Sequence, residues 1–386
     1  MKNLFNNKNI LIVKKKKFSS YYDFIIEALL KNNSPKKIKY IKFSGIKNIY
    51  KINNLIKETL YSESIDILIT ASYFFYDPKV LHQIQGKIFR IRIDGDDDWL
   101  YDHYTRWYAQ LFDLNITTSN VIKLKLRQLG YNCISIPYFF NKYKKSTKLI
   151  TDLMNHDVVF VGLVKGKEGR ENYINFLTTN KINVKIFGEQ NKKLDKFEMD
   201  YLYSHSKIII NFSRVNNDMK YITNYERDLE RKTQIKARVF EVLRCGGFLL
   251  SEYTPDLDYY FKINKDLVTF NSKENLLEKI KFYLKHNDMR IEIAKSGQKK
   301  FNKYYEYSIY IDVLSTKIEK YFNKRIKIKK YFWPTEIKRF ISRFIDYDDL
   351  FFFIIYDRAY LNFIRIDIII RRYFSSLLKF MKIKKI

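Results

Sequence analysis

Cysteine is nearly absent from this 386-residue sequence, which contains only Cys133 and Cys245, far apart in the chain. Two cysteines at that separation exclude a disulfide framework and the closely spaced ligand pairs of a zinc site, and they fit a reducing compartment. No apolar run reaches the ~18 residues of a transmembrane helix. Near the N-terminus only residues 10–13 form an uninterrupted apolar core, which is too short for a signal peptide. We therefore expect a cytoplasmic protein.

Several binding motifs are also missing, although the charge is strongly one-sided. No GxGxxG follows the first predicted strand, which argues against a dinucleotide site there. No RNP-like, KH or helix-turn-helix pattern occurs. The chain has 72 Lys and Arg against 42 Asp and Glu, a net charge of +30. That excess favours an anionic partner (nucleic acid, nucleotide phosphates or a membrane surface), but a compositional bias of the source would produce it as well.

Alternating strand and helix patterns predict an α/β protein with two Rossmann-like domains. The length allows two cores, and the hydrophobic content of 46% indicates a folded chain. Predicted strands occupy residues 9–13, 39–43, 65–70, 87–93, 115–119 and 133–138, then 158–161, 183–187, 207–212, 248–250 and 267–270. Helices are predicted over residues 273–285, 288–304 and 307–321. We place the domains at residues 1–148 and 149–322.

The stretch QIKARVFEVLRCGGFLLSEY, residues 234–253, combines a charged helix start with a tight turn. Lys236 and Arg238 place positive charge at the beginning of the predicted helix, and Glu241 lies on the same face as Arg238. Gly246 and Gly247 end the helix before an apolar strand. The bland interpretation is an exposed helix with local ion pairs. The alternative is a ligand loop, because open α/β sheets bind ligands at such places.

This stretch resembles the donor-binding half of GT-B glycosyltransferases, specifically the CgeB-like group of the group 1 type. The resemblance implies that the two Rossmann-like domains face each other across a cleft and that the helix at residues 307–321 crosses back to the first domain. The shared pattern is Glu241, a short apolar-rich segment, then Cys-Gly and a strand. The resemblance implies that Glu241 accepts hydrogen bonds from the ribose of a nucleotide-sugar, most simply a UDP-sugar. It also implies that Lys236, Arg238 and the amides of Gly246 and Gly247 hold the diphosphate without any metal or other cofactor. Many retaining relatives carry a second Glu eight positions earlier, where this chain has Thr233, so the stereochemistry stays open.

A glycine-containing loop follows the predicted strand at residues 158–161. Gly162, Gly166 and Gly169 precede a helix that starts at about Arg170, an arrangement that suits either an anion site or an ordinary turn. The resemblance implies that this loop faces the donor phosphates. Many relatives have an arginine directly after the first glycine, where this chain has Leu163. The cations that could substitute for it are Lys165, Lys167 and Arg170.

Two further strand ends are candidates for the donor site. Gly188 ends the predicted strand at residues 183–187, and Ser213 and Arg214 follow the one at 207–212. The resemblance places the position after the latter strand beside the nucleotide. Residues 215–233 are polar and charged, which is typical of a mobile loop or lid.

The sequence DGDDDW, residues 94–99, places four carboxylates at the end of a predicted strand, where α/β sheets carry their chemistry. The acids can cap the following helix, predicted over residues 100–112. Asp94 or Asp96 can instead be a general base for the acceptor hydroxyl, and His103 is a further candidate base. The third interpretation is a GT-A enzyme that binds a divalent metal through Asp94 and Asp96.

The last 64 residues, 323–386, are disproportionately basic, with 16 Lys or Arg and 6 Asp or Glu. Four of the basic residues recur every seven positions, namely Arg358, Arg365, Arg372 and Lys379. A basic stripe beside apolar residues suits an anionic membrane surface. The alternative is a helical subdomain that packs on protein. We expect a basic helical extension with peripheral attachment to the cytoplasmic membrane.

The preferred hypothesis is a glycosyltransferase that moves a sugar from a nucleotide-diphosphate sugar to a glycan or lipid-linked acceptor, in surface polysaccharide or glycoconjugate synthesis. The alternatives are a nucleic-acid-binding protein, from the charge with 32 Tyr and 31 Phe, and the GT-A enzyme. The aromatic residues mostly recur at core-like spacing, so no nucleic acid is expected as a partner.

Overall fold

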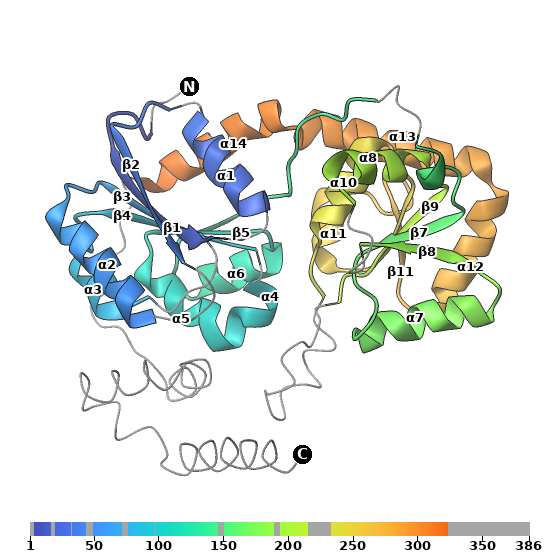
Figure 1. Cartoon of the computed structure of the whole chain (residues 1–386), viewed down its shortest axis with the longest axis horizontal. Coiled ribbons are helices and arrows are strands. Elements are labelled where there is room, and N and C mark those ends of the chain that lie inside the picture. Colours follow the sequence, from blue (N-terminus) through green and yellow to red (C-terminus); the bar gives the residue numbers. More distant parts are fainter. Residues whose placement is uncertain are drawn as a thin grey trace, which may run out of the picture.

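Two parallel sheets, each flanked by helices, make up the described part of the chain (Figure 1). The computed structural model describes residues 4–16, 20–31, 33–43, 49–71, 76–95, 97–145, 150–188, 194–214 and 233–322. Within these ranges the helices are all too short or too polar to span a bilayer. The predicted basic extension at residues 323–386 and the predicted lid at 215–232 lie outside them and stay predictions.

The first sheet has six parallel strands in the order β2-β1-β3-β4-β5-β6. The strands are β1 (Asn9–Lys15), β2 (Lys37–Phe43), β3 (Ile67–Ala71), β4 (Phe89–Asp94), β5 (Leu114–Thr117) and β6 (Cys133–Ser135). The helices are α1 (Ser20–Lys31), α2 (Ile49–Ser62), α3 (Pro78–Gln83), α4 (Asp97–Leu100), α5 (Arg106–Tyr108) and α6 (Asn120–Gln128). Every residue of β3 and β4 is buried, because helices cover both faces of a parallel sheet.

The second sheet has five parallel strands in the order β11-β10-β9-β7-β8. The strands are β7 (Val158–Val161), β8 (Val184–Phe187), β9 (Ile208–Asn211), β10 (Leu249–Glu252) and β11 (Val268–Phe270). The helices are α7 (Glu168–Thr179), α8 (Lys196–His205), α10 (Ala237–Cys245), α11 (Pro255–Tyr260), α12 (Lys273–Lys285), α13 (Asn287–Tyr304) and α14 (Tyr307–Phe322). The predicted pair of Rossmann-like α/β domains is confirmed. In this strand order the chain changes direction between β7 and β9, where such sheets bind ligands.

The last described helix, α14, returns to the first domain, as predicted from residues 307–321. Figure 1 shows α14 beside α1 rather than on the second sheet. The ring of Phe322 lies 4.9 Å from that of Phe89, and the Arg127 Nη2 group donates to the hydroxyl of Tyr321 at 3.0 Å. The predicted boundary between residues 148 and 149 stays a prediction, and the final helix of the second segment packs on the first domain.

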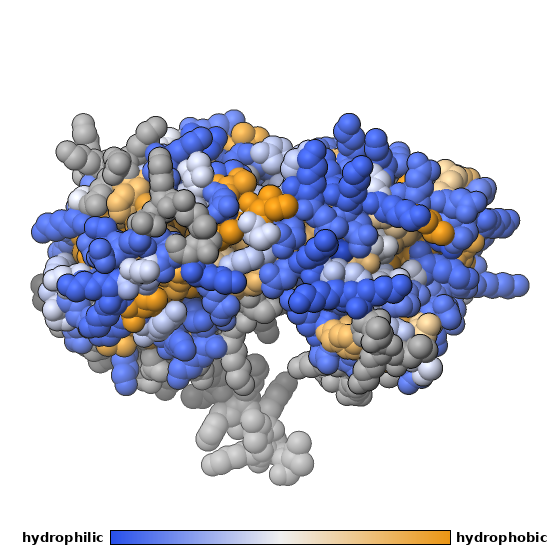
Figure 2. Space-filling view, turned by 90° about the horizontal axis from the view of Figure 1, so that it is seen from above, coloured by the Kyte–Doolittle hydropathy of each residue, from blue (hydrophilic) through white to orange (hydrophobic). Residues whose placement is uncertain are grey.

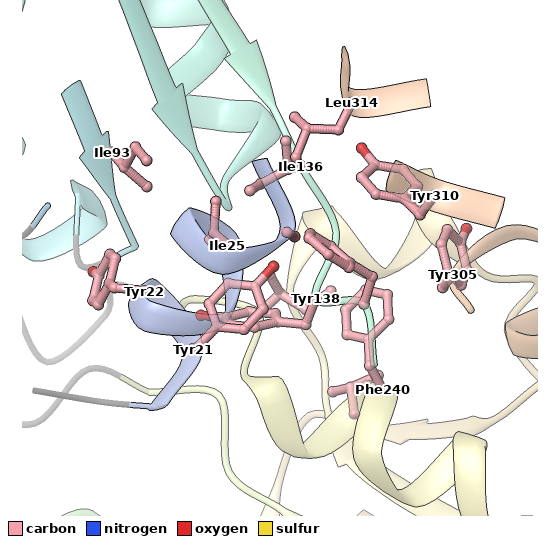
Figure 3. Packing of buried hydrophobic residues seen from close by; sticks show 14 of the residues in the cluster. Tyr21, Tyr22, Ile25, Ile93, Ile136, Tyr138, Phe240, Tyr305, Tyr310 and Leu314 are labelled. Atoms are coloured by element: carbon pink, nitrogen blue, oxygen red, sulfur yellow. The ribbon is translucent and has the colours of Figure 1, made fainter. Parts of the chain in front are cut away.

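A cluster of aromatic side chains joins the two domains (Figure 3). The Tyr138 ring lies 4.5 Å from Tyr21 of α1 and 5.9 Å from Phe240 of α10, and Phe240 lies 5.3 Å from Tyr305. The Tyr21 hydroxyl donates to the carbonyl of Pro137 at 2.7 Å, so its polar end is satisfied. These rings are buried, which accounts for part of the high aromatic content without any nucleic-acid surface.

The helical segment predicted at residues 100–112 is present but is not one regular α-helix, because a π-helical turn (Tyr101–Thr105) follows α4, and a 3-10 turn (Ala109–Leu111) follows α5. The Thr105 hydroxyl donates to Asp97 Oδ1 at 2.6 Å. Residues eight apart in a regular α-helix point about 80° away from each other. The extra residue of a π-turn reduces that angle to roughly 20°, so the turn brings Thr105 onto the face of Asp97.

One face of the molecule, seen from above, is dominated by hydrophilic residues (Figure 2). Apolar residues on the described part of this face form small, separate patches. Isolated exposed apolar side chains are normal on protein surfaces and indicate no partner by themselves.

Candidate donor site and interdomain seam

Asp94 and Asp97 are held by a buried arginine of β4. Arg92 Nη2 lies 2.9 Å from Asp94 Oδ2 and 2.5 Å from Asp97 Oδ1, and Asp94 also accepts a hydrogen bond from the Tyr22 hydroxyl. The Asp94 residue is only 1% exposed. A carboxylate that neutralises an arginine away from solvent cannot reach an acceptor hydroxyl. The prediction that Asp94 is the general base is therefore wrong, and the two-sheet fold overturns the GT-A interpretation.

The other two predicted bases of the first domain, Asp96 and His103, have side chains outside the described part of the structure. Asp96 lies outside the described residues. His103 belongs to the π-helical turn, and its side chain is outside the described part of the structure. Both stay predictions. Asp98 accepts a hydrogen bond from the Ser119 hydroxyl at 2.9 Å, so its Oδ1 atom is used between elements rather than as a helix cap.

Two arginines meet at the carboxyl end of β7. The Arg238 guanidinium lies 5.0 Å from the centre of the Phe160 ring, and that of Arg170 lies 5.6 Å from the same ring. Arg238 Nη1 donates to Asn211 Oδ1 at 3.3 Å. Burial, followed by the charge of Arg238, lowers the pKa of Arg170 to about 10. Like charges placed this close disfavour each other, so an anion bound beside them would be stabilised.

A buried carboxylate fixes a third arginine at the same edge of the sheet. Glu252, the last residue of β10, accepts hydrogen bonds from the amides of Ser213 and Arg214 at 2.9 and 3.1 Å. Its Oε1 atom lies 2.7 Å from Arg214 Nε. The Ser213 hydroxyl donates to the Glu252 carbonyl at 2.7 Å, and Ser213 is fully buried. Ser213 thus supports Arg214, which corrects the prediction that Ser213 itself contacts the nucleotide.

Gly162 and Gly188 let the ends of β7 and β8 approach Arg238. Both have positive φ angles, 145° and 85°. A Cβ atom on Gly162 would lie 3.1 Å from Arg238 Nη2, and one on Gly188 would lie 3.2 Å from the Gly162 nitrogen. The loops after β7 and β8 therefore lie close to the start of α10. The hypothesis that all three contact the donor requires this proximity.

Glu241 lies one helical turn after Arg238 and is partly buried. Burial raises the pKa of its carboxyl group, and the charges of Arg238 and Arg244 oppose that rise. Within the described ranges no protein group donates a hydrogen bond to the Glu241 side chain. Its oxygens can accept hydrogen bonds from hydroxyl groups of a ligand.

Gly246 and Gly247 lie at the other end of α10, away from the arginines. The Gly246 amide donates to the Leu243 carbonyl and the Gly247 amide to the Val242 carbonyl, both at 3.1 Å. Because α10 runs antiparallel to the strands beside it, its last residues lie at the amino edge of the sheet. The prediction that these two amides hold a diphosphate is wrong, since they complete a helix cap.

Replacing Gly247 with alanine tests this correction. A Cβ atom there would lie 2.5 Å from the Tyr203 carbonyl oxygen, so we expect a loss of about 1–3 kcal/mol of folding free energy in urea titrations. Nucleotide affinity at low temperature should be unchanged. The control is Gly169→Ala, where the Cβ atom would meet nothing within 4 Å. A specific loss of affinity in Gly247→Ala would restore the diphosphate role.

Lys236 lies at the contact between the domains, hereafter the seam. Its Nζ atom donates to Gln234 Oε1 at 3.2 Å, and Gln234 Nε2 donates to the carbonyl of Gly95 in the first domain. On the other side of the seam, the amide of Asn120 donates to Asp256 Oδ1 at 2.9 Å. Loops at the carboxyl ends of both sheets therefore meet here.

Sequence reasoning missed Asn211, Glu252 and Asp256. Asn211 and Glu252 are the last residues of β9 and β10, and each ends an apolar strand with a polar side chain. That pattern at the carboxyl end of a parallel strand was an available signal. Asp256 contacts a residue 136 positions away, and no local pattern reveals such a contact.

Comparisons with known proteins agree with this geometry. Residues 170–314 match the family described as Glycosyl transferase-like. No curated protein matches the sequence. Among solved structures, Anabaena HepE in complex with UDP and glucose superposes with a TM-score of 0.58 and 10% identity, covering 81% of this chain and 100% of that one.

Two other solved structures share the fold at similar levels. Sucrose-phosphate synthase from Thermosynechococcus elongatus has a TM-score of 0.57 and 10% identity, covering 82% of this chain and 100% of its own. A glycosyltransferase from Rickettsia africae has a TM-score of 0.55 and 13% identity, covering 82% of this chain and 99% of its own.

At these identities the structural likeness establishes the fold alone, and the family match adds the activity class. The matched segment contains Arg170, Arg214, Arg238 and Glu241, so the converging residues of the second domain lie inside it. The CgeB-like subgroup stays a prediction. The chain has the GT-B fold, and residues 170–314 in its second domain match the glycosyl transferase-like family.

Proposed function

We propose that this enzyme transfers a sugar from a UDP-sugar to a hydroxyl group of a glycan or lipid-linked acceptor. The observation that carries the proposal is the convergence of Arg170, Arg214 and Arg238 where β7 and β9 end. Guanidinium groups bind phosphate oxygens in a bidentate manner, so this edge suits a diphosphate. The comparison with HepE, whose structure contains UDP, supports uracil as the base.

In this proposal the arginines act on the leaving group. As the bond from the sugar to the diphosphate breaks, negative charge grows on the diphosphate oxygens. Donors that are already held in place stabilise that charge without reorganising. Glu252 holds Arg214 for this purpose, and Asn211 orients Arg238. Glu241 would accept hydrogen bonds from the ribose hydroxyls.

Thermal denaturation with UDP, GDP, ADP and CMP tests the donor site. A ligand that binds only the folded protein at 100 times its Kd stabilises it by about 2.7 kcal/mol. We expect UDP to raise the melting temperature most, and Glu241→Ala to lose most of that rise. Glu292→Ala is the control, because Glu292 is exposed on α13.

The role of Glu241 can be isolated with 2′-deoxy-UDP. If Glu241 binds the ribose hydroxyls, the wild type should prefer UDP over the deoxy form about 10-fold or more, the scale of a lost charge-assisted hydrogen bond. Glu241→Ala should show little preference. Equal discrimination by both proteins would remove Glu241 from the ribose site. A protein that ignores every nucleotide but binds a polynucleotide would contradict the proposed function.

A further inference from the structure

The seam between the domains places two carboxylates around one hydroxyl group. The Ser119 hydroxyl donates to Asp98 Oδ1 at 2.9 Å, and it also interacts with Asp256 of the second domain. Asp98 lies in α4, directly after β4 of the first domain. Its other oxygen, Oδ2, is buried and has no hydrogen-bond partner within the part of the chain that the structure describes.

Charged groups from three elements face Asp98. Asp256 begins the second domain's helix α11, Asp97 is its neighbour in α4, and Lys236 precedes α10. Lys236 is two residues from Arg238, which belongs to the proposed diphosphate site. Asp98 of the first domain therefore lies near the start of the helix that carries this site. The residue itself is partly exposed, which leaves a route for an acceptor.

The environment gives this carboxyl group an unusual affinity for protons. Burial, followed by the charges of Asp256 and Asp97, raises the pKa of Asp98, the hydrogen bond from Ser119 and the charge of Lys236 lower it, and the net result is a pKa of about 7. A carboxylate with a pKa near the working pH accepts a proton far more readily than an ordinary aspartate does.

The neighbouring carboxylates are unsuited to this task. Asp94 and Asp97 both pair with Arg92 and are almost fully buried. Asp256 accepts a hydrogen bond from the amide of Asn120. Among the described carboxylates of residues 94–98, Asp98 therefore combines partial exposure with an oxygen that no arginine holds.

We propose that Asp98 is the catalytic base of the transfer, which makes the reaction an inverting one; this inference rests on the proposed function. The acceptor hydroxyl gives its proton to the Asp98 carboxylate while its oxygen forms a bond to C1 of the sugar. The bond from C1 to the diphosphate oxygen breaks, and its electron pair leaves on the diphosphate. Displacement by the acceptor oxygen from the side opposite the leaving group inverts the configuration at C1.

Replacing Asp98 tests the base. We expect Asp98→Asn and Asp98→Ala to lower kcat about 10²–10⁴-fold, the usual contribution of a general base, with octyl glycosides as acceptors and UDP release as the readout. The UDP-induced rise in melting temperature should stay as in the wild type. This binding measurement separates the two proposals, because a wild type that ignores UDP would contradict the proposed function instead.

Reaction with azide distinguishes a catalytic role of Asp98 from a purely structural one. It is an anionic nucleophile with no proton to lose, so it should react with the donor in Asp98→Ala and give a glycosyl azide of inverted configuration. The wild-type product with an octyl glycoside should be inverted too. A retained product, an unchanged kcat in Asp98→Asn, or UDP binding without transfer to any octyl glycoside or azide would overturn the proposal.

Two variants should shift the pH profile of kcat/KM in opposite directions. Because the base must be ionised, wild-type kcat/KM should fall about 10-fold per pH unit below pH ~7. Asp256→Asn removes a negative neighbour, lowers the pKa of Asp98 and should move this fall to lower pH. Ser119→Ala removes a hydrogen bond to the ionised form and should move it to higher pH. Shifts in the same direction, or none, would contradict the assignment.

Discussion

Replacing Arg238 with alanine is expected to lower kcat/KM for the UDP-sugar about 10²–10³-fold, the scale of losing one pre-positioned donor to a developing negative charge. The Arg238 guanidinium lies within reach of Asn211, above Phe160 and against Gly162, where it also depresses the pKa of Arg170. Steady-state kinetics at varied donor concentration, with calorimetric titration of UDP, would measure the loss. Arg238→Lys should be intermediate, because it keeps the charge and loses the bidentate geometry.

The Arg238→Ala substitution should also affect the stability of the ligand-free protein in a predictable direction. Removing one of two mutually repelling cations should leave the ligand-free melting temperature equal to or above that of the wild type. A structural arginine would lower it. Lys299→Ala removes the same charge from an exposed position on α13 and should leave both kcat/KM and stability unchanged. If Arg238→Ala binds UDP as tightly as the wild type does, the diphosphate site is elsewhere.

Replacing Asp113 with alanine is expected to destabilise the first domain by about 3–5 kcal/mol, because it leaves the Arg90 charge buried and uncompensated. Both side chains are fully buried, and two atoms of each pair at 3.0 Å. The remaining contact of Arg90, a hydrogen bond to the carbonyl of Leu81, cannot neutralise a full charge. Urea unfolding followed by circular dichroism would measure the shift in the transition of the first domain.

An exposed ion pair of the same chain serves as the control for Asp113→Ala. Asp157 lies 2.7 Å from Lys207, but their side chains are 58% and 48% exposed. Asp157→Ala should therefore change the stability by less than about 1 kcal/mol. The double variant Arg90→Met/Asp113→Leu should recover much of the loss, since apolar residues can replace a buried pair. A loss as small in Asp113→Ala as in Asp157→Ala would show that Arg90 reaches solvent.

The two predictions concern two arginines, Arg238 and Arg90, and only the site of Arg238 suits a ligand. Arg90 has a bidentate carboxylate partner, so its charge is satisfied within the protein. Arg238 and Arg170 face each other without a carboxylate between them, and the Nε atoms of both are buried without a partner in the described residues. The difference in pairing, rather than the presence of arginine, separates a structural site from a candidate anion site.

The strands could be predicted from sequence because each is a short apolar run between helical patterns. Residues 9–13, 158–161 and 207–212 were placed within a residue or two of β1, β7 and β9. A parallel sheet buries both faces of its strands, so the apolar pattern is continuous and strong. The placement of Arg238 and Glu241 on one helix face also followed from a local pattern, because residues three apart in an α-helix lie on the same face.

The chemical partners of each charged residue could not be read from the sequence, because they are set by contacts between distant segments. The sequence DGDDDW does not distinguish one aspartate from another. In the structure Arg92 neutralises Asp94 and Asp97, whereas Asp98 lies beside Ser119 and Asp256. Gly246 and Gly247 follow Glu241 in the chain, yet the direction of α10 puts them at the far edge of the sheet.

The sequence by itself thus determined two α/β domains and one helix face that carries Arg238 and Glu241, because apolar periodicity and helix facing are local properties. Only the tertiary structure decided which carboxylates are neutralised, which glycines line the site and which residues meet at the seam. Burial and pairing set the charge and reach of a side chain, and both depend on segments that fold together from more than a hundred residues away.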